Sequence, residues 1–117
     1  MSLVARKLEA HGIATVIAGS ALDIVTHAGV PRFLFNDFPL GNPIGKPFDR
    51  VMQRAVVRQS LELLAQAKGP ATHWQTPFEW SADESWRAVY ARVDASNRER
   101  LKALGDERRA RQAAKKR

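Results

Sequence analysis

The 117-residue sequence contains no cysteine. This absence excludes disulfides, thiolate metal ligands, thiol redox chemistry and a cysteine nucleophile from anything that the chain does alone. Long apolar runs are absent too, because no run approaches the roughly 20 residues that a membrane-spanning helix needs. The N-terminal residues also lack the apolar core of a signal peptide. We therefore expect a cytoplasmic protein without a membrane segment.

Histidine is scarce. The three histidines, His11, His27 and His73, show no metal-ligand spacing. The first two lie near predicted helix C-termini, where the helix dipole or solvent accounts for them. We therefore expect no metal site.

Positive charge is concentrated at one end of the chain. The net charge is +7, but residues 98–117 hold nine basic and three acidic residues, whereas residues 1–97 hold ten and nine. We predict a domain over residues 1–104 and a basic tail over residues 105–117, frayed or disordered because its last ten residues include nothing apolar larger than alanine. No aromatic or groove-reading motif accompanies the tail, so we do not expect nucleic acid as a partner.

Three short apolar runs alternate with segments of helical periodicity. The runs at residues 13–18, 33–38 and 72–76 predict strands, and the first is free of charge, which favours burial on both faces. Helices are predicted up to about Gly12, over residues 21–28, over residues 49–67, and from residue 81 to Gly105. This order predicts a small three-layer α/β domain with a parallel sheet of about three strands and a long C-terminal helix.

A parallel sheet of three strands raises a physical difficulty. Parallel strands need cover on both faces, and three strands leave two edges with unpaired backbone groups. We interpret the chain as part of a larger α/β fold that a partner chain or an oligomer completes. The alternative is a small, self-sufficient three-layer domain.

Residues 33–49 read as a buried strand, a stiff loop and a helix start. Asp49 is a good helix N-cap residue. Ligands bind at such strand ends in open α/β sheets. In the loop, glycines would let backbone N–H groups approach an anionic or carbonyl group, and Lys46 would attract a carboxylate. The alternative is a rigid connector that touches no ligand. The candidate residues for a ligand or subunit-interface site are Asp37, Pro39, Gly41, Asn42, Pro43, Gly45, Lys46 and Pro47.

Two residues at the strand ends, Asp37 among these loop candidates and Ser20 as a secondary candidate, each have two interpretations. Asp37 is interpreted first as a hydrogen-bonding cap on the loop amides, with an acid–base role as the alternative. Ser20 is interpreted first as a helix cap, with ligand contact second.

Aromatic residues gather late in the sequence. Packing of the last helix into a core explains them, and the alternative is an interface anchor, because aromatic side chains are enriched in the buried centres of protein interfaces. The residues concerned are Trp74, Phe78, Trp80, Trp86 and Tyr90.

The segment Phe38-Pro39-Leu40-Gly41-Asn42-Pro43 carries a resemblance to a known family. Together with the amphipathic first helix, residues 10–16 and the Val-Pro-Arg at residues 30–32, it resembles the C-terminal segment of the selenoprotein B family of glycine, sarcosine, betaine and D-proline reductases. The similarity is to the shorter bacterial members, which keep the Phe-Pro-Leu-Gly form of the loop. It covers about residues 1–67 and, more weakly, residues 70–104.

The resemblance implies reductive cleavage of a substrate by a selenocysteine or cysteine motif, which in that family lies N-terminal to the matched segment. This chain has no cysteine, so the redox residue is expected on a partner, and no cofactor is expected in this chain. The hypothesis is a small subunit of a heteromeric reductase-like enzyme, which completes the active site of a larger subunit and shares its small-molecule substrate. One alternative is a non-catalytic accessory or assembly protein with a reductase-derived fold. Another is a nucleic-acid-associated protein that binds through its tail.

Overall fold

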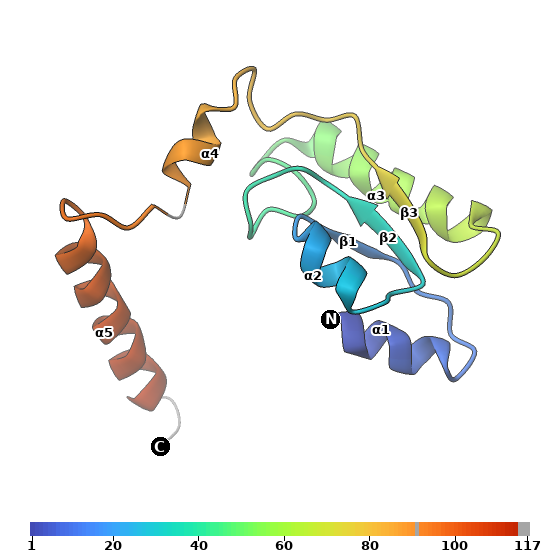
Figure 1. Ribbon diagram of the computed structural model, residues 1–117, viewed down its shortest axis with the longest axis horizontal. Coiled ribbons are helices and arrows are strands. Elements are labelled where there is room, and N and C mark those ends of the chain that lie inside the picture. Colours follow the sequence, from blue (N-terminus) through green and yellow to red (C-terminus); the bar gives the residue numbers. More distant parts are fainter. Residues whose placement is uncertain (91, 115–117) are drawn as a thin grey trace. The chain divides into compact units, whose positions relative to one another are not determined.

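The computed structural model describes residues 1–90 and 92–114 (Figure 1). Contacts within the chain divide it into two units, Met1–Trp86 and Arg87–Arg117. The predicted division at residue 104 stays a prediction. Within the described residues, no helix has the length and apolar character needed to cross a membrane.

The first unit is built around a parallel sheet, as predicted. Its strands are β1 (Ile17–Gly19), β2 (Arg32–Phe35) and β3 (Thr72–Gln75), in the order β1-β2-β3. In the register of the sheet, Ala18 lies opposite Leu34, and Leu34 lies opposite Trp74. The central strand is therefore the one that leads into the proline- and glycine-rich loop.

Helices of very different length surround and follow this sheet. The longest helix of the first unit, α3, begins and ends within one residue of its predicted limits, because the caps and the apolar period agree there. The helices are α1 (Ser2–Glu9), α2 (Leu22–His27), α3 (Arg50–Gln66), α4 (Ser85–Val89) and α5 (Arg98–Ala114).

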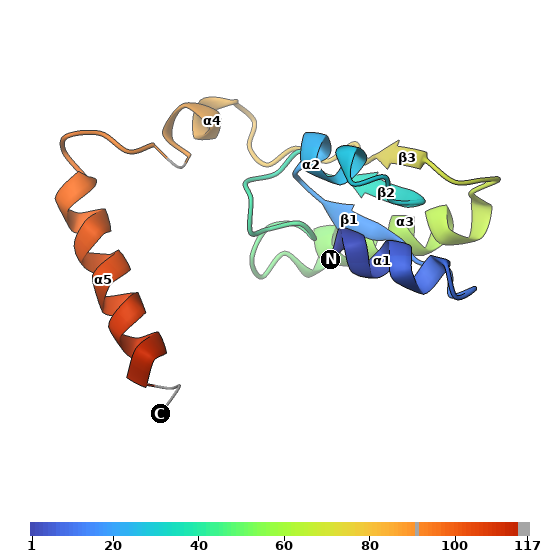
Figure 2. The ribbon, with the colours of Figure 1, turned by 60° about the horizontal axis from the view of Figure 1, so that its bottom comes forward.

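Alternation along β2 divides the core into two halves. Phe33 points to one face, where it packs with Val25 of α2 and with Val30. Leu34 points to the other face, where it packs with Val56 and Leu63 of α3. Figure 2 shows the sheet between α2 and α3. The predicted three-layer α/β class is confirmed.

The two strand connections have opposite hands. The strands advance across the sheet in one direction, yet α2 and α3 cover opposite faces. One connection must therefore be left-handed, whereas connections between parallel strands of one sheet are almost always right-handed.

The first strand is shorter and less buried than predicted. It begins at Ile17 instead of residue 13, because the residues before it form a loop that is tied to its surroundings. There, the hydroxyl of Thr15 donates to Glu9 at 2.9 Å, and Arg32 donates to the carbonyl of Thr15 at 3.4 Å. Ile17 and Ala18 are only half-buried, so the prediction of a strand buried on both faces is wrong for β1.

The predicted long C-terminal helix is present as α5 (Arg98–Ala114), but its predicted bounds, residue 81 to Gly105, are wrong. Side chains compete for the backbone between α4 and α5: Asn97 accepts from the backbone N–H of Asp94 at 3.0 Å, and Asp94 accepts from that of Ser96 at 2.9 Å. No residue of α4 or α5 is buried, so packing does not favour one continuous helix. The helix α5 does not end at Gly105 but continues to Ala114.

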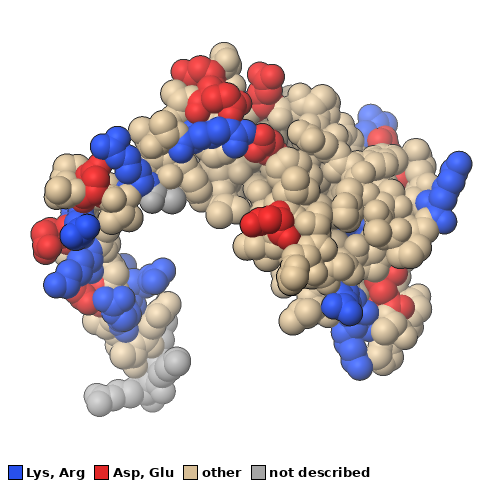
Figure 3. Space-filling model, in the orientation of Figure 1, with Lys and Arg blue, Asp and Glu red and all other residues tan. Residues whose placement is uncertain are grey.

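The helix α5 carries charges of both signs along its length (Figure 3). Arg109 lies 2.5 Å from Asp106, and Arg111 pairs with Glu107 one turn along. Such exposed pairs contribute little to stability.

Candidate functional site

The loop of residues 36–49 leaves β2 at the carboxyl end of the sheet and leads into α3 (Figure 1). Asp49 caps the helix, as predicted, because its carboxylate accepts from the backbone N–H of Met52 at 3.0 Å. Gly41 and Gly45 have φ angles of +98° and +121°, which side-chain-bearing residues rarely adopt. The loop path therefore depends on these two glycines.

Asn36, the first residue of this loop, attaches the loop to the strands. It was not among the site residues predicted from the sequence. Its side chain is fully buried. Its amide nitrogen donates to the carbonyl of Pro43 at 2.9 Å, and its side-chain oxygen accepts from the hydroxyl of Thr76 at 2.7 Å. Its backbone N–H donates to Gly19 at 2.9 Å. Asn36 thus joins the carboxyl ends of all three strands to the loop. The signal in the sequence was a polar residue directly after an apolar strand.

The second half of the loop is held against α3. A Cβ atom on Gly45 would lie 3.0 Å from Cγ of Met52, so the backbone passes very close to the helix. The backbone carbonyl of Lys46 accepts from the side chain of Gln53 at 2.7 Å. These contacts are those of a rigid connector. A ligand role for the loop stays a prediction.

The predicted loop residues differ in exposure. Pro39 and Gly45 are buried, and Gly41 and Pro47 are exposed. The half-buried members are Asp37, Asn42, Pro43 and Lys46.

A polar hollow of about 250 Å³ lies where β2 and β3 end. Asp37, Glu79 and Glu84 bring three carboxylates to its wall. The rest of the wall consists of Gln75, Thr76, Pro77, Phe78 and Trp80. Three of the eight residues that line the hollow are thus acidic. Lys46, predicted to attract a carboxylate, is not among its lining residues.

Within residues 1–90 and 92–114, no three His, Asp or Glu side chains are grouped so that they could hold a metal ion. The expected lack of a metal site stays a prediction.

Ser20 is not a helix cap, so this prediction is wrong. The N-cap of α2 is Ala21, and no side chain caps that helix. The hydroxyl of Ser20 is buried and has no hydrogen-bond partner in the described part of the chain. Its secondary role in ligand contact stays a prediction.

The aromatic residues from Trp74 to Tyr90 do not form a single cluster. Trp74, Phe78 and Trp80 pack against the core between β2 and α3, and the ring of Trp80 lies 5.8 Å from that of Phe38. Core packing of these three residues is thus shown, although against the sheet and not against a last helix. Trp86 and Tyr90 belong to different units. An interface role for Trp74, Trp80, Trp86 and Tyr90 stays a prediction.

The fold and the loop define an α/β protein with its candidate site at the carboxyl ends of parallel strands. The chain is 30% identical over 80 residues to D-proline reductase subunit gamma of Acetoanaerobium sticklandii. The match covers 68% of this chain but only 33% of the relative, so the chain spans about a third of that protein's length. This similarity supports a distant relation to the reductase family. No protein-family model and no solved structure matches the chain.

Proposed function

We propose that this chain is a small subunit of a heteromeric reductase-like enzyme and is not catalytic alone. In this proposal, the loop of residues 36–49 completes an active site whose redox-active cysteine or selenocysteine lies on a larger subunit. The observation that carries the proposal is the 30% identity over 80 residues to D-proline reductase subunit gamma.

Two features of the chain support a nucleophile on the larger subunit and a substrate-binding wall on this chain. The sequence has no cysteine, so it supplies no thiolate for a reductive step. The loop lies at the carboxyl ends of the strands, where open α/β sheets bind ligands, and Asn36 and Asp49 hold it in place. The larger subunit would provide the nucleophile, and this chain would provide a rigid wall of the substrate site.

The acidic hollow beside the loop indicates which substrate group would lie there. Asp37, Glu79 and Glu84 line it, and carboxylates attract the ammonium group of an amino or imino acid. The substrate carboxylate would then lie nearer the backbone N–H groups of the loop and Lys46.

Co-expression of the full chain with a larger reductase-like chain that contains the redox-active cysteine or selenocysteine tests the proposal. We expect a stable complex by native mass spectrometry and, with a dithiol as the electron donor, turnover that neither chain shows alone. In that complex, Lys46→Ala and Gly41→Ala should lower turnover and leave assembly intact. Lys68→Ala, at an exposed position just beyond α3, serves as the control and should change neither. A chain that forms no complex and adds nothing to the larger chain's turnover would contradict the proposal.

A further inference from the structure

An apolar groove of about 340 Å³ lies between α3 and β1. Its wall consists almost wholly of aliphatic side chains, and the one hydroxyl in it, that of Ser60, is already bonded to the carbonyl of Val56 at 3.0 Å. The groove therefore offers apolar surface without a free polar group to bind a polar ligand. The aliphatic residues are Met1, Val16, Ile17, Ala18, Ile44, Val57 and Leu61.

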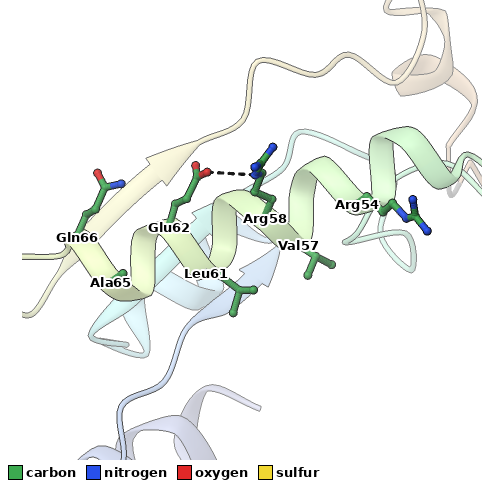
Figure 4. Close-up of a pocket in the computed structure, with 7 residues that line it drawn as sticks. All are labelled: Arg54, Val57, Arg58, Leu61, Glu62, Ala65 and Gln66. Atoms are coloured by element: carbon green, nitrogen blue, oxygen red, sulfur yellow. Dashed lines mark ion pairs between the residues drawn. The ribbon is translucent and has the colours of Figure 1, made fainter.

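The groove exists because α3 covers the sheet incompletely. On this face, Leu34 of β2 is fully buried beneath the helix, but Val16 and Ala18 at β1 remain half-buried. Val57 and Leu61 are 46% and 59% exposed and point to the same side of α3, away from Glu62 and Gln66 (Figure 4). The helix thus has a second apolar side, and the side chains of Val16 and Ala18 on this face are covered only in part.

The exposed edge and the partly covered face of β1 indicate which structure would cover them. Strands of a parallel sheet are normally buried on both faces by helices, and a strand at the sheet edge leaves backbone N–H and C=O groups unpaired. In the described part of the chain, β1 pairs with β2 alone. A strand beside β1, followed or preceded by a helix in the groove, would satisfy both needs at once.

We propose that the larger subunit supplies such a strand–helix unit, with its strand paired to β1 and its helix seated in the groove. This inference rests on the proposed function and names the surface by which the two subunits join. The loop of residues 36–49 begins at the carboxyl end of the same sheet. If the partner strand is parallel to β1, its carboxyl end would lie at the same edge of the sheet as the start of this loop.

Charge at the rim favours an acidic partner helix. Val57 and Leu61 also border a neighbouring hollow to which Arg54, Arg58 and Glu62 contribute. Arg58 lies 3.6 Å from Glu62 and points with it away from Val57 and Leu61 (Figure 4), whereas Arg54 has no ion pair within the described residues. The chain's own α5 is a poor occupant, because it carries six basic and three acidic residues. A second copy would bring another Arg54 to the rim. A partner helix with carboxylates beside its apolar face fits best.

The test uses the co-expressed complex of the full chain and the larger reductase-like chain. Hydrogen exchange of the complex, compared with the chain alone, should slow at the amides of β1 and across residues 57–61 of α3. Leu61→Asp and Val57→Asp should each weaken the complex at least tenfold. Val51→Asp, on the same helix but outside the groove and with a side chain 82% exposed, should not. Circular dichroism of each variant checks that it folds.

The outcomes separate this inference from the proposed function. If the complex forms but Leu61→Asp binds as tightly as the parent, with protection elsewhere on the chain, the groove assignment is wrong and the subunit function stands. If no complex forms, the proposed function fails and this inference fails with it. If the chain instead forms a dimer with itself that Leu61→Asp dissociates, the groove is a contact between copies, and the assignment to a larger subunit is wrong.

Discussion

Thr76 donates its hydroxyl to the side-chain oxygen of Asn36 at 2.7 Å, and so joins the end of β3 to the end of β2. The two residues are 40 positions apart in the sequence, and they are only 4% and 0% exposed. The other end of the Asn36 side chain donates to Pro43 in the loop. Buried hydrogen-bonding groups are costly to leave unpaired. This pair should therefore fix both the strand ends and the loop.

Asn36→Ala is predicted to lower the free energy of unfolding by about 2–4 kcal/mol, because it leaves the buried hydroxyl of Thr76 and the carbonyl of Pro43 without their partner. Urea denaturation followed by circular dichroism measures the change. Asn42→Ala, in the same loop but half-buried, is the matched control and should change stability by less than about 0.5 kcal/mol. A double-mutant cycle with Thr76→Val should show a coupling of about 0.5–3 kcal/mol. Additive effects would contradict the direct bond.

The sequence predicted the elements of the first unit well where local patterns decide them. The helix α3 was predicted from the cap at Asp49 and the apolar period that follows, and the structure confirms both. Asn36 was missed because its role depends on Thr76, which no local pattern connects to it. The opposite hands of the two connections were equally invisible, since each strand and helix looks the same in either arrangement.

The errors in the candidate site also have physical causes. Ser20 fits a capping pattern, but α2 begins one residue later than that pattern requires and its N-cap is Ala21. The spacing of Trp86 and Val89 does form a short helix, α4, but side-chain hydrogen bonds around Asp94 interrupt the pattern beyond it. Periodicity alone did not show that this helix has no core to pack against.

Asp49→Ala is predicted to lower the free energy of unfolding by about 1 kcal/mol, because it removes the acceptor for the backbone N–H of Met52. Asp49→Asn keeps an oxygen in the same place and should cost less. Thermal unfolding of the two variants beside the parent chain measures the difference. Equal losses in both would show that the negative charge at the start of α3, and not the hydrogen bond, matters.

Glu9 should make the fold sensitive to acid. Burial raises the pKa of Glu9, but hydrogen bonds from Thr15 and Arg32 outweigh it, so that its pKa in the fold lies below the ordinary value of 4.5. The ion pair with Arg32 measures 2.8 Å. A lowered pKa stabilises the fold above the unfolded pKa, and this contribution is lost as the pH falls from about 4.5 through the folded pKa.

Urea denaturation between pH 7 and pH 3 measures this effect. Glu9→Gln should lower stability at pH 7 and reduce the loss of stability on acidification. Glu62→Gln is the control, because its ion pair with Arg58 is largely exposed and should contribute little. If the stability of the Glu9→Gln variant fell with acid as steeply as that of the parent, another carboxylate would be responsible.

Gly45→Ala should cost more stability than Gly41→Ala. Both glycines have positive φ, so each substitution meets backbone strain of about 1 kcal/mol or more. Only at Gly45 does the added Cβ also meet Met52 at 3.0 Å, whereas nothing lies within 4 Å of the added atom at Gly41. Comparison of the two variants by thermal unfolding isolates this contact. Equal losses would show that Met52 moves aside freely.

Phe48 combines two unfavourable features, because its φ is +64° and its side chain is 98% exposed. A left-handed backbone costs a bulky residue about 1–2 kcal/mol, and asparagine tolerates it much better. Phe48→Asn is therefore predicted to raise the free energy of unfolding by roughly 1 kcal/mol. Phe48→Ala should change little, because it keeps the strain and removes only an exposed ring. Urea denaturation of both variants separates the backbone from the side chain. A loss of stability in Phe48→Ala equal to that of a core substitution would mean that the ring packs inside the first unit, and Phe48 would then not be an exposed residue.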